Sequence, residues 1–411
     1  MKQGIHSPLS GLRVLDLSRI LAGPWASQLL GDLGADVVKV ERPGVGDDTR
    51  RWGPPFLRDR EGKDTGESAY YLCANRNKRS LAVDISTPKG QALLRKMAAT
   101  CDVLIENFRV GTMARYGLDY DSLRELNPGL VYCSITAFGQ EGPEAGAPGY
   151  DAMIQGRGGL MSITGVPDGQ PGAGPQKVGV AMADLTTGMY AASAIQAALL
   201  ARYRTGEGQY IDMALFDSQV AMLANQASNY LVGGHVPGRM GTAHPNIVPY
   251  QAFATADGHL MLAVGNDRQF ARLVAAMELP ELAADPRYAT NLSRTENRAE
   301  LVQRLESRFL QQTSGVWAER LAKAEVPFGP INRIDQVFDD PQSRYRGLRI
   351  ELPHNEAESV PSVANPIRFS DTPVSYRYGP PTLGEHSREV LGEWLGLEQA
   401  ELDALSSDGV I

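Results

Sequence analysis

The sequence of 411 residues contains only three cysteines and six histidines, and neither type is spaced as in common metal sites. Cys73, Cys101 and Cys133 form no Cys-x-x-Cys pair, and the histidines form neither an HxxxH nor an HExxH pattern. We therefore expect no metal site, and we interpret the cysteines as free, buried thiols.

The sequence also lacks any stretch of 18 uninterrupted apolar residues, and its first residues, MKQGIHSPLSG, do not resemble a signal peptide. Positive charge is not in excess, because 40 Lys and Arg face 48 Asp and Glu and give a formal net charge of −8. This balance disfavours nucleic-acid binding, which typically needs a basic stripe. Local arginines can still bind a small anion. We expect a cytoplasmic protein with small-molecule substrates and without a nucleic-acid or membrane partner.

Strand-like and helix-like segments alternate through the first half of the chain, as in βαβ units. Strands are predicted at 12–17, 36–41, 80–85, 102–108 and 130–138, and helices at 24–34, 88–100, 119–127 and directly after Asp184. This order predicts an α/β fold with a doubly wound parallel sheet, in which ligands bind at the carboxyl ends of the strands.

The pattern changes after residue 210, which favours two domains in a chain too long for one ordinary core. A strand at 209–216 and a long helix at 217–232 precede a hairpin at 249–264, whose turn is Asp257-Gly258, and helices fill 267–325. We predict a large domain over 1–215, a linker helix over 216–248, a small α+β domain over 249–325, and a return to the large domain over 326–411. Within the last range, 326–331 and the Pro-rich 353–382 are expected to be linkers, and 385–397 a helix.

The first βαβ unit does not carry a dinucleotide-binding motif. Its loop, SRILAGPWA (18–26), lacks the GxGxxG glycines that let a backbone approach a pyrophosphate. Arg42, at the end of the second strand, instead suits a phosphate monoester. Arg109 and Arg115 follow another strand and are candidates for the same ligand, although each of the three arginines alone is more typical of a solvated surface.

Two glycine-rich segments have both a structural and a functional interpretation. GVGDDTRRWGPPF (44–56) is a surface loop or, if Trp52 is buried between its arginines, a binding loop. GYDAMIQGRGGLMSITG (149–165) indicates either tight packing or a backbone that cradles a ligand.

Asp184 is a lone acid between a small-residue segment and a long helix. The pattern predicts that it is the N-cap, accepts a hydrogen bond from Thr186 or Thr187, and contributes about 1 kcal/mol. We expect the helix dipole to lower its pKa and keep it ionised. An ionised carboxylate among small residues is also suited to attack an acyl group, and the cap and the nucleophile are compatible roles.

Six segments together resemble the class III CoA-transferase family, of the formyl-CoA transferase and carnitine CoA-transferase type. In chain order they are LAGPWASQLLGDLGADVVKVERPG, NRNKRSLAVDI, DVLIENFRVG, LNPGLVYCSITAFGQEGP, GYD and VAMADLTTGMYA. The resemblance covers essentially the whole chain, down to LGEHSREVL (383–391). Within the family, 44–56 and 241–253 are most similar to the succinyl-CoA:glutarate CoA-transferases.

The resemblance implies an enzyme that moves CoA from an acyl-CoA donor, here succinyl-CoA, to a dicarboxylic acid, with glutarate favoured and itaconate or a similar diacid next. It implies that Asp184 is the nucleophile, through aspartyl anhydride and aspartyl-CoA thioester intermediates, and that Asp151 is a second carboxylate of the active site. No tightly bound cofactor is implied, since CoA thioesters are substrates. The implied CoA contacts are Ala22, Arg42, Val83, Ile85, Asn107, Phe108, Arg109, Arg115 and Tyr150.

For the acceptor acid, the candidates are Arg50, Gly241 and His244, since a buried distal carboxylate needs a cation or strong donors. Leu21 replaces a polar residue of the formyl-CoA enzymes, which argues against formate or oxalate as substrates. The resemblance further implies an interlocked homodimer.

Two other functions stay open. An α-methylacyl-CoA racemase of the same fold has a histidine where this chain has Tyr150, whose ordinary pKa near 10 makes it a poor base. The second is a non-enzymatic CoA-binding protein, against which the intact Asp184 argues.

Overall fold

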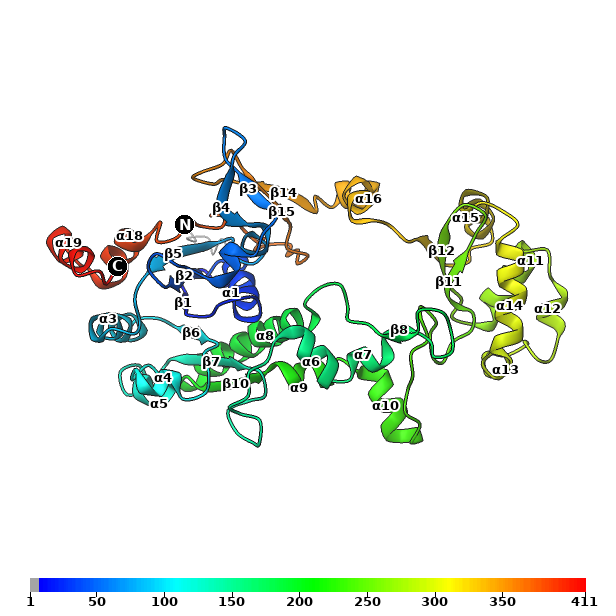
Figure 1. The fold of residues 1–411 in the computed structure, drawn as a ribbon, viewed down its shortest axis with the longest axis horizontal. Helices are drawn as coiled ribbons and strands as arrows, with labels where there is room; N and C mark the ends of the chain where they lie inside the picture. Colours follow the sequence, from blue (N-terminus) through cyan, green and yellow to red (C-terminus); the bar gives the residue numbers. More distant parts are fainter. Residues whose placement is uncertain (1–6) are drawn as a thin grey trace. The chain divides into compact units, whose positions relative to one another are not determined.

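The computed structural model describes residues 7–411, in which the chain forms two compact units that alternate along the sequence (Figure 1). The large unit contains residues 7–160, 177–235 and 342–411, and the small unit contains 161–176 and 236–341. Both ends of the described chain therefore belong to the large unit. Residues 161–176, which the sequence analysis placed in the large domain, belong to the small unit.

Within residues 7–411, six strands of the large unit form one parallel sheet in the order β10-β7-β6-β1-β2-β5. This confirms the predicted α/β class. The strands are β1 (Arg13–Asp16), β2 (Asp36–Glu41), β5 (Lys78–Ala82), β6 (Val103–Glu106), β7 (Val131–Thr136) and β10 (Tyr210–Ala214).

Helices cover both faces of this sheet, and successive side chains of a strand point into two different cores. Val37 lies in the core formed with α1 (Ala22–Asp32) and α8 (Met182–Thr205). Val38 lies in the opposite core, formed with α3 (Pro88–Ala98) and α18 (Ser387–Leu395). Burial on both faces explains why most of the strands read as continuous apolar runs.

The other elements of the large unit are short, and some differ from prediction. The helix expected at 217–232 is two helices, because Ala224, the first residue of the second helix, adopts a positive φ of 42°. The expected linker 353–382 contains a strand, β15 (Val360–Val363), that pairs with β14 (Arg349–Leu352). These elements are η1 (Asp48–Arg51), β3 (Phe56–Arg58), β4 (Asp64–Ser68), α2 (Ala69–Leu72), α4 (Thr112–Arg115), α5 (Tyr120–Arg124), α6 (Asp151–Arg157), α9 (Leu215–Ala221), α10 (Ala224–Gly233), β14 (Arg349–Leu352), β15 (Val360–Val363) and α19 (Gln399–Ser407).

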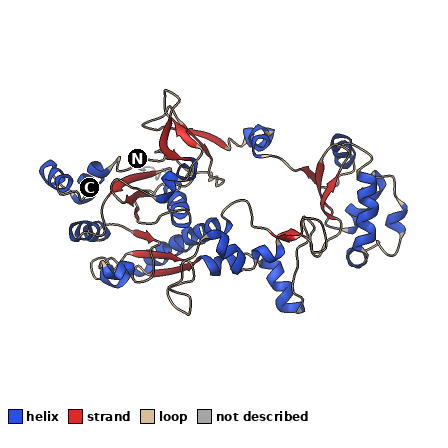
Figure 2. Cartoon of the chain, in the orientation of Figure 1, coloured by secondary structure: helices blue, strands red, loops and turns tan. Residues whose placement is uncertain are grey.

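The small unit is an antiparallel sheet packed against helices (Figure 2). The predicted hairpin is confirmed as β11 (Tyr250–Ala254) and β12 (His259–Ala263). Residues 326–331 are not only a linker, since β13 (Phe328–Pro330) pairs with β12. Its helices are α11 (Asp267–Ala276), α12 (Glu281–Ala284), α13 (Asn291–Glu296), α14 (Arg298–Phe309), α15 (Ser314–Lys323) and α16 (Ile334–Asp339). β8 (Gly165–Val166) and β9 (Gly174–Pro175) form a separate pair, and α7 (Leu160–Ile163) and α17 (Pro341–Tyr345) lie at the unit boundaries.

The order of the strands reverses direction between β1 and β6. From β1 the chain builds outward through β2 and β5, and then returns to β6 and builds the other side through β7 and β10. In open α/β sheets, ligands bind outside the carboxyl ends of the strands at such a switch point. Among residues 7–411, no helix has the length and apolar character needed to cross a membrane.

Candidate active site

A cavity of about 280 Å³ lies at the switch point, outside the carboxyl ends of β1, β6 and β7. Its wall combines residues 19–22 after β1, residues 107–110 after β6, residues 135–137 at the end of β7, and residues 145–150. Asp48, Asp184 near the start of α8, and Leu215 complete the lining. The cavity therefore gathers several segments and two acidic residues, Asp48 and Asp184, from distant parts of the sequence.

Two of these loops are bonded directly to each other across the switch point. The backbone N–H of Arg19 donates to the side-chain oxygen of Asn107 at 2.9 Å, and the side-chain amide of Asn107 donates to the carbonyl of Arg19 at 2.7 Å. The pair fixes the loop after β1 against the loop after β6, where adjacent strands would otherwise diverge.

Asp184 is not the N-cap that the sequence predicts. Helix α8 begins at Met182 after Ala181, so Asp184 is already the third residue of the helix. The carboxylate of Asp151 takes the capping role instead, since one of its oxygens accepts from the N–H of Ala183 at 2.8 Å and from that of Asp184 at 3.4 Å. The amide of Gln155 donates to the other oxygen of Asp151 at 2.7 Å.

The pKa of Asp184 is raised, not lowered as predicted from the helix dipole. Only 8% of the residue is exposed, and burial, followed by the negative charge of Asp151, raises its pKa to about 7. A carboxylate that is desolvated and faces a like charge is more basic than an ordinary one. Above pH 7 the cavity therefore holds an ionised, poorly solvated carboxylate.

Gly188 sets how closely the starts of α1 and α8 approach. It lies one helical turn after Asp184, on the same face of α8. A Cβ on Gly188 would lie 2.6 Å from the carbonyl oxygen of Ala22 and 3.1 Å from the Cβ of Trp25. Since the first of these atoms belongs to the backbone, any side chain here would push α1 away from the cavity wall.

The predicted CoA-contact residues fall into two groups. The cavity is lined by Ala22, Asn107, Phe108, Arg109 and Tyr150. The lining does not include Arg42, Val83, Ile85 or Arg115. Arg42 and Arg115 are exposed, Ile85 is half-buried and Val83 is buried. For both groups, contact with CoA stays a prediction.

The geometry of Arg50 does not fit the predicted role in binding the acceptor acid. Its guanidinium is buried and donates to Glu41 at 2.7 and 2.8 Å and to Glu67 at 2.6 Å. It also donates to the hydroxyl of Tyr71 at 2.6 Å. The hydrogen bonds of the guanidinium are therefore already made to groups inside the protein. The neighbouring Trp52 is 43% exposed and not buried between arginines.

Gly241 and His244 lie in the small unit. Gly241 has a positive φ of 62°, and its N–H donates to the carbonyl of Gly165 at 3.1 Å. The ring of His244 stacks on Tyr250, with 5.3 Å between the ring centres. Contact of Gly241 and His244 with an acceptor acid stays a prediction.

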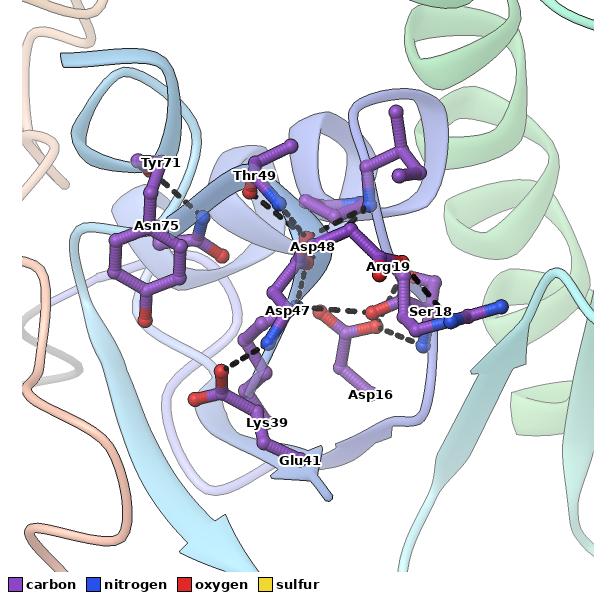
Figure 3. A network of polar contacts seen from close by, with 12 residues as sticks. Asp16, Ser18, Arg19, Lys39, Glu41, Asp47, Asp48, Thr49, Tyr71 and Asn75 are labelled. Atoms are coloured by element: carbon purple, nitrogen blue, oxygen red, sulfur yellow. Dashed lines mark hydrogen bonds and ion pairs between the residues drawn. The ribbon is translucent and has the colours of Figure 1, made fainter. Parts of the chain in front are cut away.

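Sequence reasoning missed a buried charge network beneath the cavity wall. Lys39 of β2 and Asp47 form an ion pair of 2.9 Å without solvent contact (Figure 3). Asp47 also accepts from the N–H of Ile20, which lines the cavity. One signal was available, since Lys39 interrupts the apolar strand DVVKVE. In the range 7–411, no group of three or more His, Cys, Asp or Glu is arranged to hold a metal ion.

Gly188→Ala is expected to destabilise the protein, because the new methyl group meets the carbonyl of Ala22. We expect a loss of about 1–3 kcal/mol in the free energy of unfolding, measured by chemical denaturation. The control is Gly392→Ala in α18, where a Cβ meets only the carbonyl of Leu397 at 3.9 Å. That variant is expected to gain up to about 1 kcal/mol from helix propensity. Equal stabilisation of both variants would contradict the close approach.

Comparison with known proteins assigns the chain to a family. The model of CoA-transferase family III matches residues 9–387. A succinate–glutarate CoA-transferase of Agrobacterium fabrum is 52% identical, over 95% of this chain and 97% of that protein. A succinyl-CoA:glutarate CoA-transferase of Mus musculus is 46% identical, over 98% of this chain and 90% of that protein. The crystal structure of a CaiB/BaiF family protein from Brucella suis, 51% identical, matches with a TM-score of 0.83 over 95% of this chain and all of that one. The chain therefore belongs to CoA-transferase family III, as the sequence resemblance predicts.

Proposed function

We propose that this enzyme transfers CoA from succinyl-CoA to a dicarboxylic acid, with glutarate as the first candidate and Asp184 as the covalent nucleophile. The observation that carries the proposal is a buried carboxyl group with a pKa near 7 in the wall of the switch-point cavity. The names of the relatives from Agrobacterium fabrum and Mus musculus support the substrate pair.

The transfer proceeds in four acyl-exchange steps, each of which balances without ATP or a metal. The Asp184 carboxylate attacks the carbonyl carbon of the succinyl thioester, the C–S bond breaks, and CoA leaves as a thiolate, which gives a mixed succinyl–aspartyl anhydride. The thiolate then attacks the aspartyl carbonyl and releases succinate, which leaves an aspartyl-CoA thioester. The acceptor carboxylate displaces the thiolate to form a second anhydride. Attack of the thiolate on its acceptor carbonyl yields the new acyl-CoA and restores Asp184.

The start of α1 supports this chemistry electrostatically. Ala22, the first residue of α1, shares the cavity wall with Asp184, and no side chain caps this end of the helix. The first N–H groups and the positive end of the helix dipole favour negative charge, which develops on oxygen in each tetrahedral intermediate.

Several finer features rest on the family resemblance. We propose that Arg42, Arg109 and Arg115 contact the phosphate groups of CoA, and that Gly241 and His244 contact the acceptor acid. We also propose an interlocked homodimer and a cytoplasmic location. The dimer is supported by apolar side chains that the single chain exposes on α10, where Leu231 is 79% and Val232 is 89% exposed.

The pH dependence of kcat/KM tests the state of Asp184. Since only the carboxylate attacks, we expect kcat/KM for succinyl-CoA to fall about tenfold per pH unit below the pKa of about 7. Asp151→Asn removes the neighbouring negative charge but retains an oxygen that can accept from Ala183. It is expected to shift this limb to lower pH. A profile that stays flat between pH 6 and 8 would contradict the assignment.

The Asp184→Asn variant separates the nucleophilic role of Asp184 from its contribution to stability. We expect kcat to fall by at least about 1,000-fold, equivalent to ~4 kcal/mol of barrier, with CoA binding retained. The pKa of Asp184 rises from 3.8 in the unfolded chain to about 7, so the folded state binds more protons between these values and loses stability as pH rises through them. Above pH 7 the Asn variant is therefore expected to unfold at a temperature no lower than wild type.

Hydroxylamine trapping of wild type during turnover, followed by mass spectrometry, is expected to modify the peptide that contains Asp184. If the Asn variant, checked for deamidation, kept more than about a tenth of wild-type kcat, the nucleophile would lie elsewhere.

A substrate panel tests the acceptor. With succinyl-CoA as donor, we expect glutarate and other C5–C6 dicarboxylic acids to give higher kcat/KM values than monocarboxylic acids of equal chain length. The comparison isolates the distal carboxylate, since the alkyl chain is held constant. Higher values for monocarboxylic acids throughout would refute a dicarboxylate acceptor.

A further inference from the structure

The loop after β1 contains a strained backbone position in the cavity wall. Ile20 has a φ of 72°, in the left-handed region that a β-branched residue rarely adopts. It lines the cavity together with Leu21, the N-cap of α1, and Ala22, the first residue of that helix. Such strain persists only where surrounding contacts over-determine it, and it concentrates at functional sites.

The contacts that hold this position come from a buried ion pair outside the cavity lining. The N–H of Ile20 donates to the two carboxylate oxygens of Asp47 at 3.2 and 3.3 Å. The ammonium of Lys39 donates to Asp47 at 2.9 Å and to the carbonyl of Ser18 at 2.9 Å (Figure 3). The pair therefore binds the loop at Ser18 and at the strained residue itself.

Asp47 is itself fixed in place. Its N–H donates to Glu41 at 2.9 Å, and the N–H and hydroxyl of Thr49 donate to its carboxylate at 3.0 and 2.8 Å. Burial opposes its ionisation, but the charge and hydrogen bond of Lys39 outweigh this and lower the pKa of Asp47 to about 2. The carboxylate therefore stays charged throughout the working range of the enzyme.

We propose that Lys39 and Asp47 are positioning residues of the transfer reaction, which hold Ile20 in its left-handed conformation and thereby keep the start of α1 in the cavity wall shared with Asp184. The inference rests on the proposed role of Asp184. Neither residue lines the cavity, and they reach its wall through the backbone of residues 18–22 and through Asp48, which follows Asp47 in the chain and lines the cavity. The contact surface at Gly188 transmits the position of Ala22 directly to α8.

Two substitutions separate this role from general stability. Asp47→Asn keeps an oxygen for Ile20 but removes the charge that balances Lys39. The control, Asp32→Asn, breaks another buried ion pair, Asp32–Arg76 at 2.7 Å, at the opposite end of α1 and away from the cavity lining. We expect both variants to unfold at lower temperature.

Only Asp47→Asn is expected to lower kcat, by about tenfold or more, because small displacements of a reacting site are costly. Its KM for succinyl-CoA is expected to stay within about threefold of wild type, and Asp32→Asn is expected to keep kcat within the same factor. Equal losses of kcat in the two variants would overturn the proposal. If Asp47→Asn does not fold, Asp47→Glu, which keeps the charge but displaces the carboxylate, is compared with Asp32→Asn in the same way.

A rescue variant tests the strained residue directly. Glycine adopts a φ near 72° without steric cost. The double variant Ile20→Gly, Asp47→Asn is therefore expected to have a kcat at least about threefold higher than that of Asp47→Asn alone. Absence of any rescue would show that the pair does not act through Ile20. Hydroxylamine trapping in single-turnover experiments distinguishes the two hypotheses. No adduct on Asp184 in wild type refutes the nucleophile, whereas adduct formation at the wild-type rate in Asp47→Asn refutes the positioning role alone.

Discussion

The geometry of the site depends on charged side chains that have lost contact with solvent beneath the loop after β1. Lys39 reaches the carbonyl of Ser18 at 2.9 Å, and Lys78 reaches that of Pro24 at 3.0 Å. Asp16 and Asp47 supply the opposite charges. Removing one partner of a buried pair leaves an uncompensated charge, which is far more costly than the pair itself. The end of β1 and the first turn of α1 are thus fixed by a requirement for charge balance, and not by apolar packing alone.

In the same low-dielectric interior, the pKa of a buried carboxyl group depends on its neighbours. Burial opposes ionisation of Asp16, but Lys78, Lys39 and two serine hydroxyls outweigh it and lower its pKa. Asp184 meets burial and a like charge, which raise its pKa to about 7. Burial also raises the pKa of Glu106 to about 7, although this residue does not line the main cavity. A raised pKa therefore does not identify a nucleophile by itself, and the cavity position of Asp184 makes the difference.

Local sequence patterns predicted the elements well where apolar residues at most positions mark the segment. Strand β2 occupies exactly the predicted range 36–41, whereas β5 begins two residues before the predicted 80–85, at Lys78. Lys78 and Arg79 read as a polar boundary, but carboxylates from other strands neutralise them inside the sheet. The role predicted for Arg50 does not fit the structure for the same reason, since Glu67 lies 17 residues away in the sequence. The sequence alone does not reveal which charged residues become partners when they lie far apart along the chain.

The assignment of Asp184 as an N-cap is wrong for an instructive reason. An acid at the start of a helix competes with every other acid that the fold brings there. Asp151, 32 residues before Ala183, accepts from the N–H groups of Ala183 and Asp184 and so takes the capping role that a local pattern gives to Asp184. This division of roles suits covalent chemistry. A carboxylate occupied by backbone N–H donors is a stabilised, weaker nucleophile, whereas one relieved of capping keeps its lone pairs for the substrate. Because the capping acid also raises the pKa of its neighbour, the fold couples the start of α8 to the reactivity of the group it presents.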